Sequence, residues 1–173
     1  MYHGDIVHAL EGGDRRSMGR VNQVVAHVRG TPTRFSTLID CMNHEDEFVR
    51  MRAADAAEKL TVANSQWLQP FRRQLIGLAA QAEQKELRWH LAQMLPRLDL
   101  SGQDRQMAVT ILRRYLGDHR CIVRTCAMQG LADFAQQDTR LTKSIRPILS
   151  RLIRTESASI KSRGCKLLAQ LGA

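Results

Sequence analysis

The sequence predicts an all-α protein in which about four to five helical hairpins stack into a short α-solenoid. Two observations support this fold class: one helical pattern of apolar residues occurs four times, and a second marker recurs at the same spacing. Aromatic residues make up only 5% of the chain, whereas residues that favour helices are plentiful. No segment alternates apolar and polar residues for long enough to predict a strand.

The clearest copy of the helical pattern is DEFVRMRAADAAEKL, residues 46–60. Four segments superpose without gaps at offsets of 38, 36 and 37 residues, namely 48–60, 86–98, 122–134 and 159–171. The preceding helices carry a marker spaced 38, 38 and 39 residues apart, formed by Pro32, Pro70, Ala108 and Pro147. Because two independent markers share one spacing, the chain is expected to be an array of two-helix repeats.

Each copy carries apolar or small residues at positions 0, 4, 7, 8 and 11, counted from Val49 or its equivalent. These positions occupy roughly a 100° arc of a helix, which is the stripe of a helix buried on one side. One hairpin cannot cover that stripe, so neighbouring hairpins must stack on it. Small residues in the first and third copies favour close approach of the helices. Pro96 interrupts the second copy, so that helix is expected to kink or end there.

In chain order, a short helix is expected over 2–10, followed by a helix from an Asp14 N-cap to Val28. Later helices are expected over 33–42, 46–60, 70–81, 85–98, 104–116, 121–135, 141–154 and 159–171. Ser101 and Asp104 have the spacing of a capping box. We expect a single domain over 1–173, with a degenerate N-terminal cap over 1–30 and repeats over 31–62, 64–98, 101–136 and 139–172.

The formal charge of +9 is concentrated in residues 101–173, which carry 13 Lys and Arg against 5 Asp and Glu. A basic half can attract nucleic acid, acidic proteins or an anionic membrane, or it can be a solvated surface. The four cysteines contain no CxxC pair, so neither a zinc site nor a disulfide framework is expected, and Cys165 should be buried. Neither a signal peptide nor an apolar run of membrane-spanning length is present, so we expect a cytoplasmic protein without a membrane partner.

The pattern V-R-x-x-A-x-x-A at Val49–Ala56, in a two-helix unit of about 37 residues with Pro in the first helix, resembles the HEAT repeat. The bacterial HEAT-like, armadillo-type repeat proteins are the nearest group, and the resemblance covers residues 31–172, with 1–28 as a degenerate first repeat. It implies a right-handed α-α superhelix whose second helices line a concave binding face. It also implies pairing between Asp118 and Arg124, whereas other residues replace the Asp in the remaining copies. The resemblance transfers no single activity.

Positions 2, 6 and 9 of the second helices point away from the buried stripe and are expected to line a groove on the concave face. The candidate partner-binding residues are Met51, Asp55, Glu58, Trp89, Gln93, Gln129 and Lys166. An exposed Trp89 beside Met51 would be a hot spot for a protein or peptide partner. Alternatively, Trp89 folds onto a neighbouring helix or lies under the N-terminus.

Positions 1 and 3 form a basic row beside this groove. The candidate polyanion contacts are Arg50, Arg52, Arg88, Arg124, Lys161 and Arg163. Such a row can follow a phosphate backbone, or it can bond to carbonyls and acids of the loops between repeats. The basic residues of the later first helices are expected on the opposite, convex side, where they offer a place for an acidic partner.

No catalytic, metal-binding or cofactor-binding constellation stands out. Glu86 and His90 share a helix face without a third metal ligand, and Asp55 or Glu58 can meet His90 only across adjacent repeats. We therefore predict a non-enzymatic interaction module or scaffold that binds a protein or peptide on its concave face. Nucleic-acid binding, as in HEAT-like DNA-binding proteins, is the alternative. An apolar outer face on Ile160–Leu171 also predicts a homodimer through the C-terminal repeat.

Overall fold

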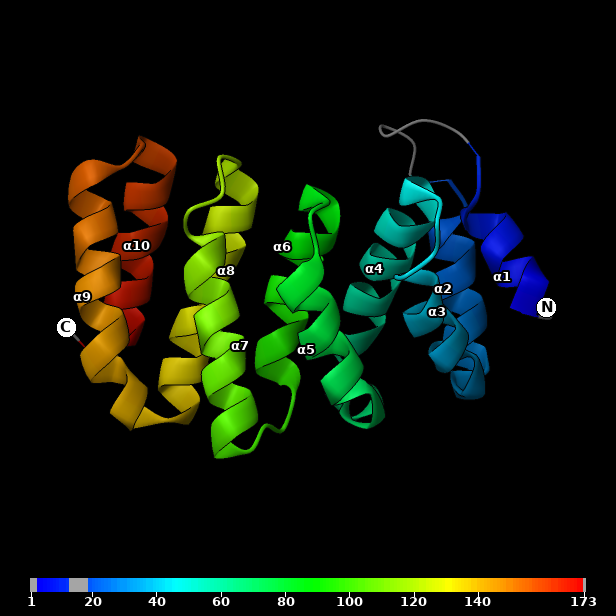
Figure 1. Ribbon diagram of the computed structural model, residues 1–173, viewed down its shortest axis with the longest axis horizontal. Coiled ribbons are helices and arrows are strands. Elements are labelled where there is room, and N and C mark those ends of the chain that lie inside the picture. Colours follow the sequence, from blue (N-terminus) through cyan, green and yellow to red (C-terminus); the bar gives the residue numbers. More distant parts are fainter. Residues whose placement is uncertain (1–2, 13–18, 173) are drawn as a thin grey trace.

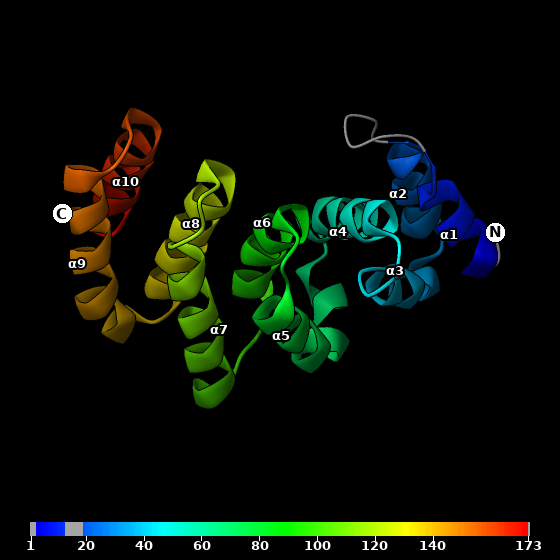
Figure 2. The same ribbon diagram turned by 45° about the horizontal axis from the view of Figure 1, so that its top comes forward.

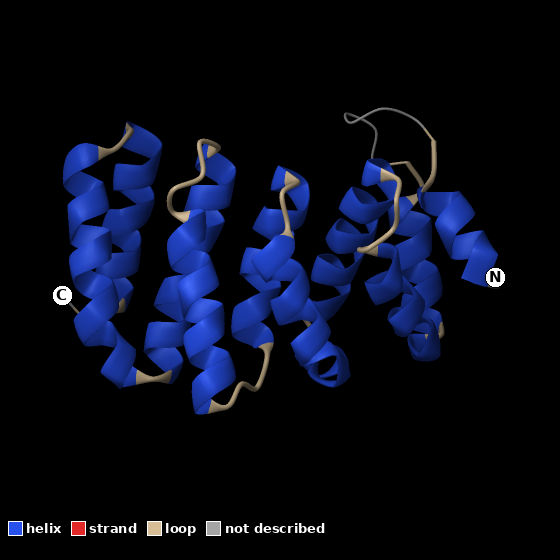
Figure 3. Ribbon diagram, in the orientation of Figure 1, coloured by secondary structure: helices blue, strands red, loops and turns tan. Residues whose placement is uncertain are grey.

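The computed structural model describes residues 3–12 and 19–172, and within these ranges it contains helices and no strand (Figure 3). The α-helices are α1 (His3–Leu10), α2 (Val21–Gly30), α3 (Phe35–Cys41), α4 (Glu47–Thr61), α5 (Arg72–Gln81), α6 (Lys85–Met94), α7 (Gly102–Tyr115), α8 (Cys121–Gln137), α9 (Thr139–Thr155) and α10 (Ala158–Gln170). Three 3-10 helices cover Pro32–Arg34, Ser65–Phe71 and Leu95–Arg97. The all-α prediction is confirmed, while the predicted Asp14 N-cap lies outside the described residues.

The helices form a single row of hairpins in chain order, from the N-terminus at the right of Figure 1 to the C-terminus at the left. The same order is visible in the turned view of Figure 2. The second helices α4, α6, α8 and α10 form one layer, and the first helices α5, α7 and α9 lie in front of it in Figure 1. We call these the second-helix layer and the first-helix layer. The arrangement is the predicted α-solenoid.

The second-helix layer is the more tightly packed of the two. Successive second helices contact one another more extensively than successive first helices do. Gly130 of α8 makes this close packing possible: a Cβ atom there would lie 2.7 Å from the carbonyl oxygen of Ala92 and 2.8 Å from Cδ1 of Leu112. Only a residue without a side chain fits at this crossing.

Local signals explain where several helices begin and end. The carboxylate of Asp46 accepts a 2.7 Å hydrogen bond from the backbone N–H of Phe48 and so caps α4. Helix α6 ends at Met94 and continues as a 3-10 turn around Pro96, as predicted. The predicted capping box at Ser101 is wrong, because the Ser101 side chain makes no capping hydrogen bond. Its partner Asp104 is one methylene shorter than the Glu or Gln that completes this motif.

The core follows the predicted stripe, and it extends one position further. Val49, Ala53 and Leu60 of α4 are almost completely buried, as are the equivalent residues of α6 and α8. Position 5 is also buried in the first three copies, at Ala54, Ala92 and Met128, because this side of each second helix faces the next hairpin. These contacts bury the apolar stripes that no isolated hairpin can cover.

The outer face of α10 differs from the prediction. Cys165, at position 5 of the last copy, is exposed rather than buried. Lys161 and Ala169 are exposed on the same side, whereas the large apolar residues Ile160 and Leu167 are 1% exposed. Leu168 and Leu171 are half-buried against the core, so no large apolar residue of this segment is fully exposed and the predicted homodimer surface is not supported. Among the described residues, the large apolar side chains that are exposed lie elsewhere, at Val62, Met107 and Ile122.

None of the helices described has the combination of length and apolar character that a membrane crossing requires.

The close approach at Gly130 can be tested by substitution. Gly130→Ala should lower the free energy of unfolding by about 1–3 kcal/mol, because the new methyl group overlaps backbone that cannot move away. Gly77→Ala is the matched control, since a Cβ atom at that helical position of α5 meets nothing within 4 Å. The control should stabilise the protein by roughly 0.5–1 kcal/mol. Urea unfolding of both variants checks this, and equal stability changes would contradict the packing described.

Candidate functional site

A hollow of about 470 Å³ lies on the second-helix layer between α6 and α8. Its lining residues are Gln93, Pro96, Arg97, Gln129, Asp133, Gln136 and Gln137. Gln93 and Gln129 occupy position 6 of adjacent copies, so the repeat places two equivalent amides side by side. Both were predicted as partner-binding residues, and the structure brings these two together in one hollow.

The glutamine amides of the hollow have hydrogen-bonding capacity left over. Gln93 donates a 3.2 Å hydrogen bond to the Trp89 carbonyl, and Gln129 donates a 2.6 Å bond to the Asp133 carboxylate. Within the described residues, neither amide carbonyl oxygen accepts a hydrogen bond from another group, although each has two lone pairs. The hollow therefore presents two free amide oxygens as hydrogen-bond acceptors, one from each repeat. The two NH₂ groups can also leave their present acceptors and donate to a ligand.

Arg97 and Asp133 line the same hollow but were not predicted. Both stand at position 10, four residues after the glutamines and therefore on the same helix face, a spacing that could have identified them. Arg97 forms an ion pair with Glu58 and donates 2.9 Å to the Glu58 carbonyl, which links α4 to the turn after α6. Burial raises the pKa of Asp133, and the hydrogen bond from Gln129 with the charges of Arg163 and Arg97 offsets only part of that rise.

Other predicted groove residues lie outside the hollow. Met51 and Asp55 are only 7% and 8% exposed, so the expectation that they point into an open groove is wrong. Helix α4 is contacted by α1, α2, α3 and α6, which cover more of its circumference than the repeat pattern implies. Trp89 is half-buried against the core, and its ring lies 5.5 Å from that of His90. Lys166 is exposed on α10.

Asp55 and His90 meet across adjacent repeats, as the sequence allowed. Oδ1 of Asp55 lies 4.0 Å from Nε2 of His90, and Oδ2 of Asp55 accepts a 2.7 Å hydrogen bond from Lys59. Burial lowers the pKa of His90 to about 4, an effect that Glu58 opposes and Lys59 increases. The imidazole is thus uncharged at neutral pH, and the pair acts as a buried contact between α4 and α6.

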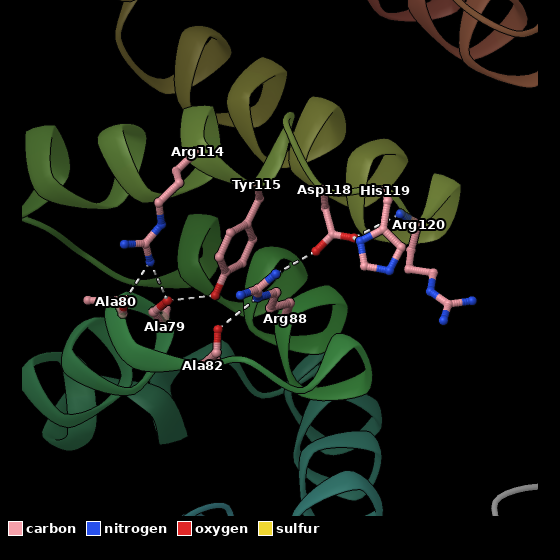
Figure 4. Close-up of polar contacts among 9 residues, drawn as sticks. All are labelled: Ala79, Ala80, Ala82, Arg88, Arg114, Tyr115, Asp118, His119 and Arg120. Atoms are coloured by element: carbon pink, nitrogen blue, oxygen red, sulfur yellow. Dashed lines mark hydrogen bonds and ion pairs between the residues drawn. The ribbon is translucent and has the colours of Figure 1, made fainter.

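Arginines at position 1 form a ladder of contacts between hairpins, and Figure 4 shows the contacts of one of them, Arg88. Arg88 donates 2.7 Å to the Ala82 carbonyl of its own hairpin and 2.6 Å to the Asp118 carboxylate of the next one. Arg50 does the same, donating 2.7 Å to the His44 carbonyl and 3.1 Å to the side chain of Gln84. The structural interpretation of these arginines is thereby favoured over the phosphate-binding one.

The partner of Asp118 differs from the one implied by the HEAT resemblance. Asp118 pairs with Arg88 of the preceding hairpin instead of Arg124, and Arg124 forms its ion pair with Glu156 of the following hairpin. Burial acts to raise the pKa of Asp118. Hydrogen bonds from the Arg120 backbone and from Arg88, together with the Arg88 charge, outweigh burial and leave that pKa below its ordinary value.

The remaining candidate polyanion contacts differ in their exposure to solvent. Arg52 has no exposed surface, and its guanidinium donates 2.6 Å to the Leu10 carbonyl at the end of α1, so its expected contact with a polyanion is wrong. Lys161 and Arg163 are exposed on α10. The row therefore does not present a continuous basic track. No group of three His, Cys, Asp or Glu side chains suited to a metal ion occurs in the part of the chain that is described.

The ladder can be tested at one rung. Arg88→Met should lower the free energy of unfolding by about 2–3 kcal/mol, because it leaves the Asp118 carboxylate, whose side chain is 2% exposed, without its cation. Lys161→Met changes the same repeat position at an exposed site and should alter stability by less than about 0.5 kcal/mol. Urea unfolding measures both, and a similar loss in the two variants would argue against the ladder.

The buried histidine predicts a pH dependence. Because the folded pKa of His90 lies near 4 and the unfolded value near 6.5, only the unfolded chain takes up a proton as the pH falls between them. The free energy of unfolding should fall by about 2 kcal/mol from this group between about pH 7.5 and pH 5. His90→Gln should remove that loss, and His119→Gln, at a side chain that is 80% exposed, should not. Unfolding curves at both pH values decide the matter; identical pH slopes in the three proteins would refute it.

Comparison with known proteins supports the assignment of the fold. The chain is similar to the designed armadillo repeat protein YIII(Dq.V1)4CPAF in complex with peptide (KR)4, with 14% identity, a TM-score of 0.66, and coverage of 96% of this chain and 80% of that chain. It also matches the designed armadillo repeat protein YIII(Dq)4CqI, with 14% identity, a TM-score of 0.41, and coverage of 99% and 100%. No curated protein sequence matches the chain.

The family model described as HEAT repeat domain matches residues 10–116. That range covers more than half of the chain and includes the hairpins that carry Arg50 and Arg88. The repeat pattern, the stacked hairpins and this match agree. The chain belongs to the HEAT repeat domain family.

Proposed function

We propose that this protein is a non-enzymatic scaffold that holds an extended peptide segment of a protein partner in the hollow between α6 and α8. The observation that carries the proposal is the pair of equivalent amides, Gln93 and Gln129, in one depression of the second-helix layer. Amide side chains can accept from the N–H groups and donate to the C=O groups of an extended main chain. Such contacts bind a peptide backbone whatever its side chains are.

The charges around the hollow favour a mixed or acidic peptide over a strongly basic one. Arg97 and Asp133 supply one cation and one anion at its wall, and Arg163 contributes to the electrostatic environment of Asp133. The armadillo repeat protein of the similar structure is in complex with the peptide (KR)4, which shows that the shared fold can hold a peptide. A chain with a formal charge of +9 should repel that basic sequence.

Nucleic-acid binding has less support in the contacts of the basic row. Arg50, Arg88 and Arg124 are engaged between hairpins, and Arg52 is buried. A phosphate backbone would have to compete with these contacts. We therefore do not propose this function.

The proposal is tested with peptides selected from a random display library on the wild-type chain. Affinities are measured by fluorescence anisotropy against the double variant Gln93→Ala/Gln129→Ala. Removal of two amides that hydrogen-bond the peptide backbone should weaken binding by about tenfold or more. Gln103→Ala/Gln106→Ala removes two exposed glutamines from α7 in the first-helix layer and should change the affinity less than about twofold.

Two results would contradict this site. If the selected peptides bind equally well to both double variants, the hollow does not hold them. If the α7 variant alone weakens binding, the peptide site lies on the first-helix layer. Thermal unfolding monitored by circular dichroism should show that both double variants keep the wild-type fold.

A further inference from the structure

A second groove, of about 530 Å³, lies on the other side of the molecule between the C-terminal halves of α7 and α9. It is lined by Arg113, Arg114, Leu116, Gly117, Ile148, Arg151, Leu152, Thr155 and Glu156. Successive first helices pack less extensively than successive second helices, which leaves room for this groove. It shares no lining residue with the hollow between α6 and α8.

The groove combines apolar and basic side chains. Leu116 and Ile148 are half-buried against the core, and Leu152 is buried, so aliphatic groups from both helices form an apolar part of the lining. Arg113 of α7 and Arg151 of α9 add two guanidinium groups, whereas the guanidinium of Arg114 is turned toward α5 (Figure 4). The groove therefore differs from a solvated polar face, because it has an apolar surface, and from a cluster of charges alone, because the cations flank that surface.

These arginines have no carboxylate partner among the described residues. Arg113 donates 2.9 Å to the Ser144 hydroxyl, and Arg114 donates 2.5 Å to the Ala80 carbonyl, so both are positioned without being neutralised. Arg151 is exposed. The one acid in the lining, Glu156, is in an ion pair with Arg124.

The electrostatic balance of the groove favours an anion. The C-terminal ends of α7 and α9 face it, and each contributes a partial charge of about −0.5, which opposes an anionic ligand. The two guanidinium charges of Arg113 and Arg151 outweigh this, and the Glu156 charge is balanced by Arg124. Along α9 the basic character continues through Lys143 and Arg154, which are exposed and have no ion pair within the described part of the chain.

We propose that the groove between α7 and α9 binds an acidic amphipathic segment of a protein partner. Its carboxylates would pair with Arg113 and Arg151, whose planar guanidinium groups can each donate two hydrogen bonds to one carboxylate. Its apolar side chains, three or four residues apart on a helix, would pack on Leu116, Ile148 and Leu152. A sugar-phosphate backbone satisfies the arginines equally well but has nothing to place on the aliphatic surface. The apolar lining therefore distinguishes a peptide from a nucleic acid.

The probe is a fluorescein-labelled helix-forming peptide of about 15 residues, with Leu and Ile along one face and Glu along its two edges. A peptide of the same composition in scrambled order and a DNA duplex of similar length serve as comparison ligands. Binding to the full chain is measured by fluorescence anisotropy at low and at physiological salt. The ordered peptide should bind more tightly than the scrambled one, because only it presents a continuous apolar face.

Two charge-reversed variants locate the site. Arg113→Glu/Arg151→Glu should weaken binding of the ordered peptide by about tenfold or more, since it replaces two attractive contacts with repulsive ones. Arg72→Glu/Arg73→Glu makes the same change in net charge at two exposed arginines of α5, outside the groove, and should change binding less than about twofold. Ile148→Ala tests the apolar lining. It should weaken binding of the ordered peptide by about threefold or more and leave any binding of DNA unchanged.

Several outcomes would overturn the proposal. These are an affinity of the ordered peptide weaker than about 1 mM, equal binding of the ordered and scrambled peptides, and equal losses in the α7–α9 and α5 variants. Tighter binding of the duplex, with loss of that binding in Arg113→Glu/Arg151→Glu, would assign the groove to nucleic acid instead. Because the lining residues are separate from Gln93 and Gln129, failure here leaves the peptide site of the second-helix layer untouched. Circular dichroism of each variant verifies that it is folded.

Discussion

The structure depends on a constraint that every repeat shares: an apolar stripe on its second helix that only the neighbouring hairpins can cover. Arginines in the first turn of the second helices also tie each hairpin to the next one. Arg88 satisfies a carbonyl of its own hairpin and, in the same side chain, the carboxylate of Asp118 in the next one. Apolar stacking brings adjacent hairpins together, and the arginine contact fixes their register. Neither hairpin has a complete set of partners without the other.

The two layers of helices present different surfaces. Small residues such as Gly130 let the second helices approach closely, so this side is compact and presents the polar hollow around Gln93 and Gln129. The first helices are farther apart, and a groove with basic and aliphatic lining opens between α7 and α9. A scaffold of this design offers two chemically different surfaces on opposite sides of one thin array. The repeated backbone places side chains at equivalent sites in each hairpin, and the residue types at these sites make the two surfaces chemically different.

Sequence periodicity predicted the fold well because burial of Val49 or Leu60 depends on the repeat itself, which is visible in one chain. It predicted the environment of particular side chains less well. Met51 and Asp55 occupy positions that are open in an average repeat, but α1, α2, α3 and α6 all contact this helix, and Asp55 lies against His90 of α6. The pairing of Arg88 with Asp118 joins residues of different hairpins, and a pattern read within single repeats assigned Asp118 to Arg124. Gln93 and Gln129 were identified because position 6 was assigned to the groove, and Arg97 and Asp133 were missed because position 10 was not assigned to it.

The contact between Gly130 and the Ala92 carbonyl also has a mechanical meaning. Packed protein interiors are nearly incompressible, so this crossing can serve as a fulcrum about which α8 and its hairpin tilt relative to α6. A wedge that separates first helices on one side of a fulcrum brings second helices toward one another on the other side. At this junction the first helices are α5 and α7, so a ligand that spread these two helices apart would narrow the hollow between α6 and α8.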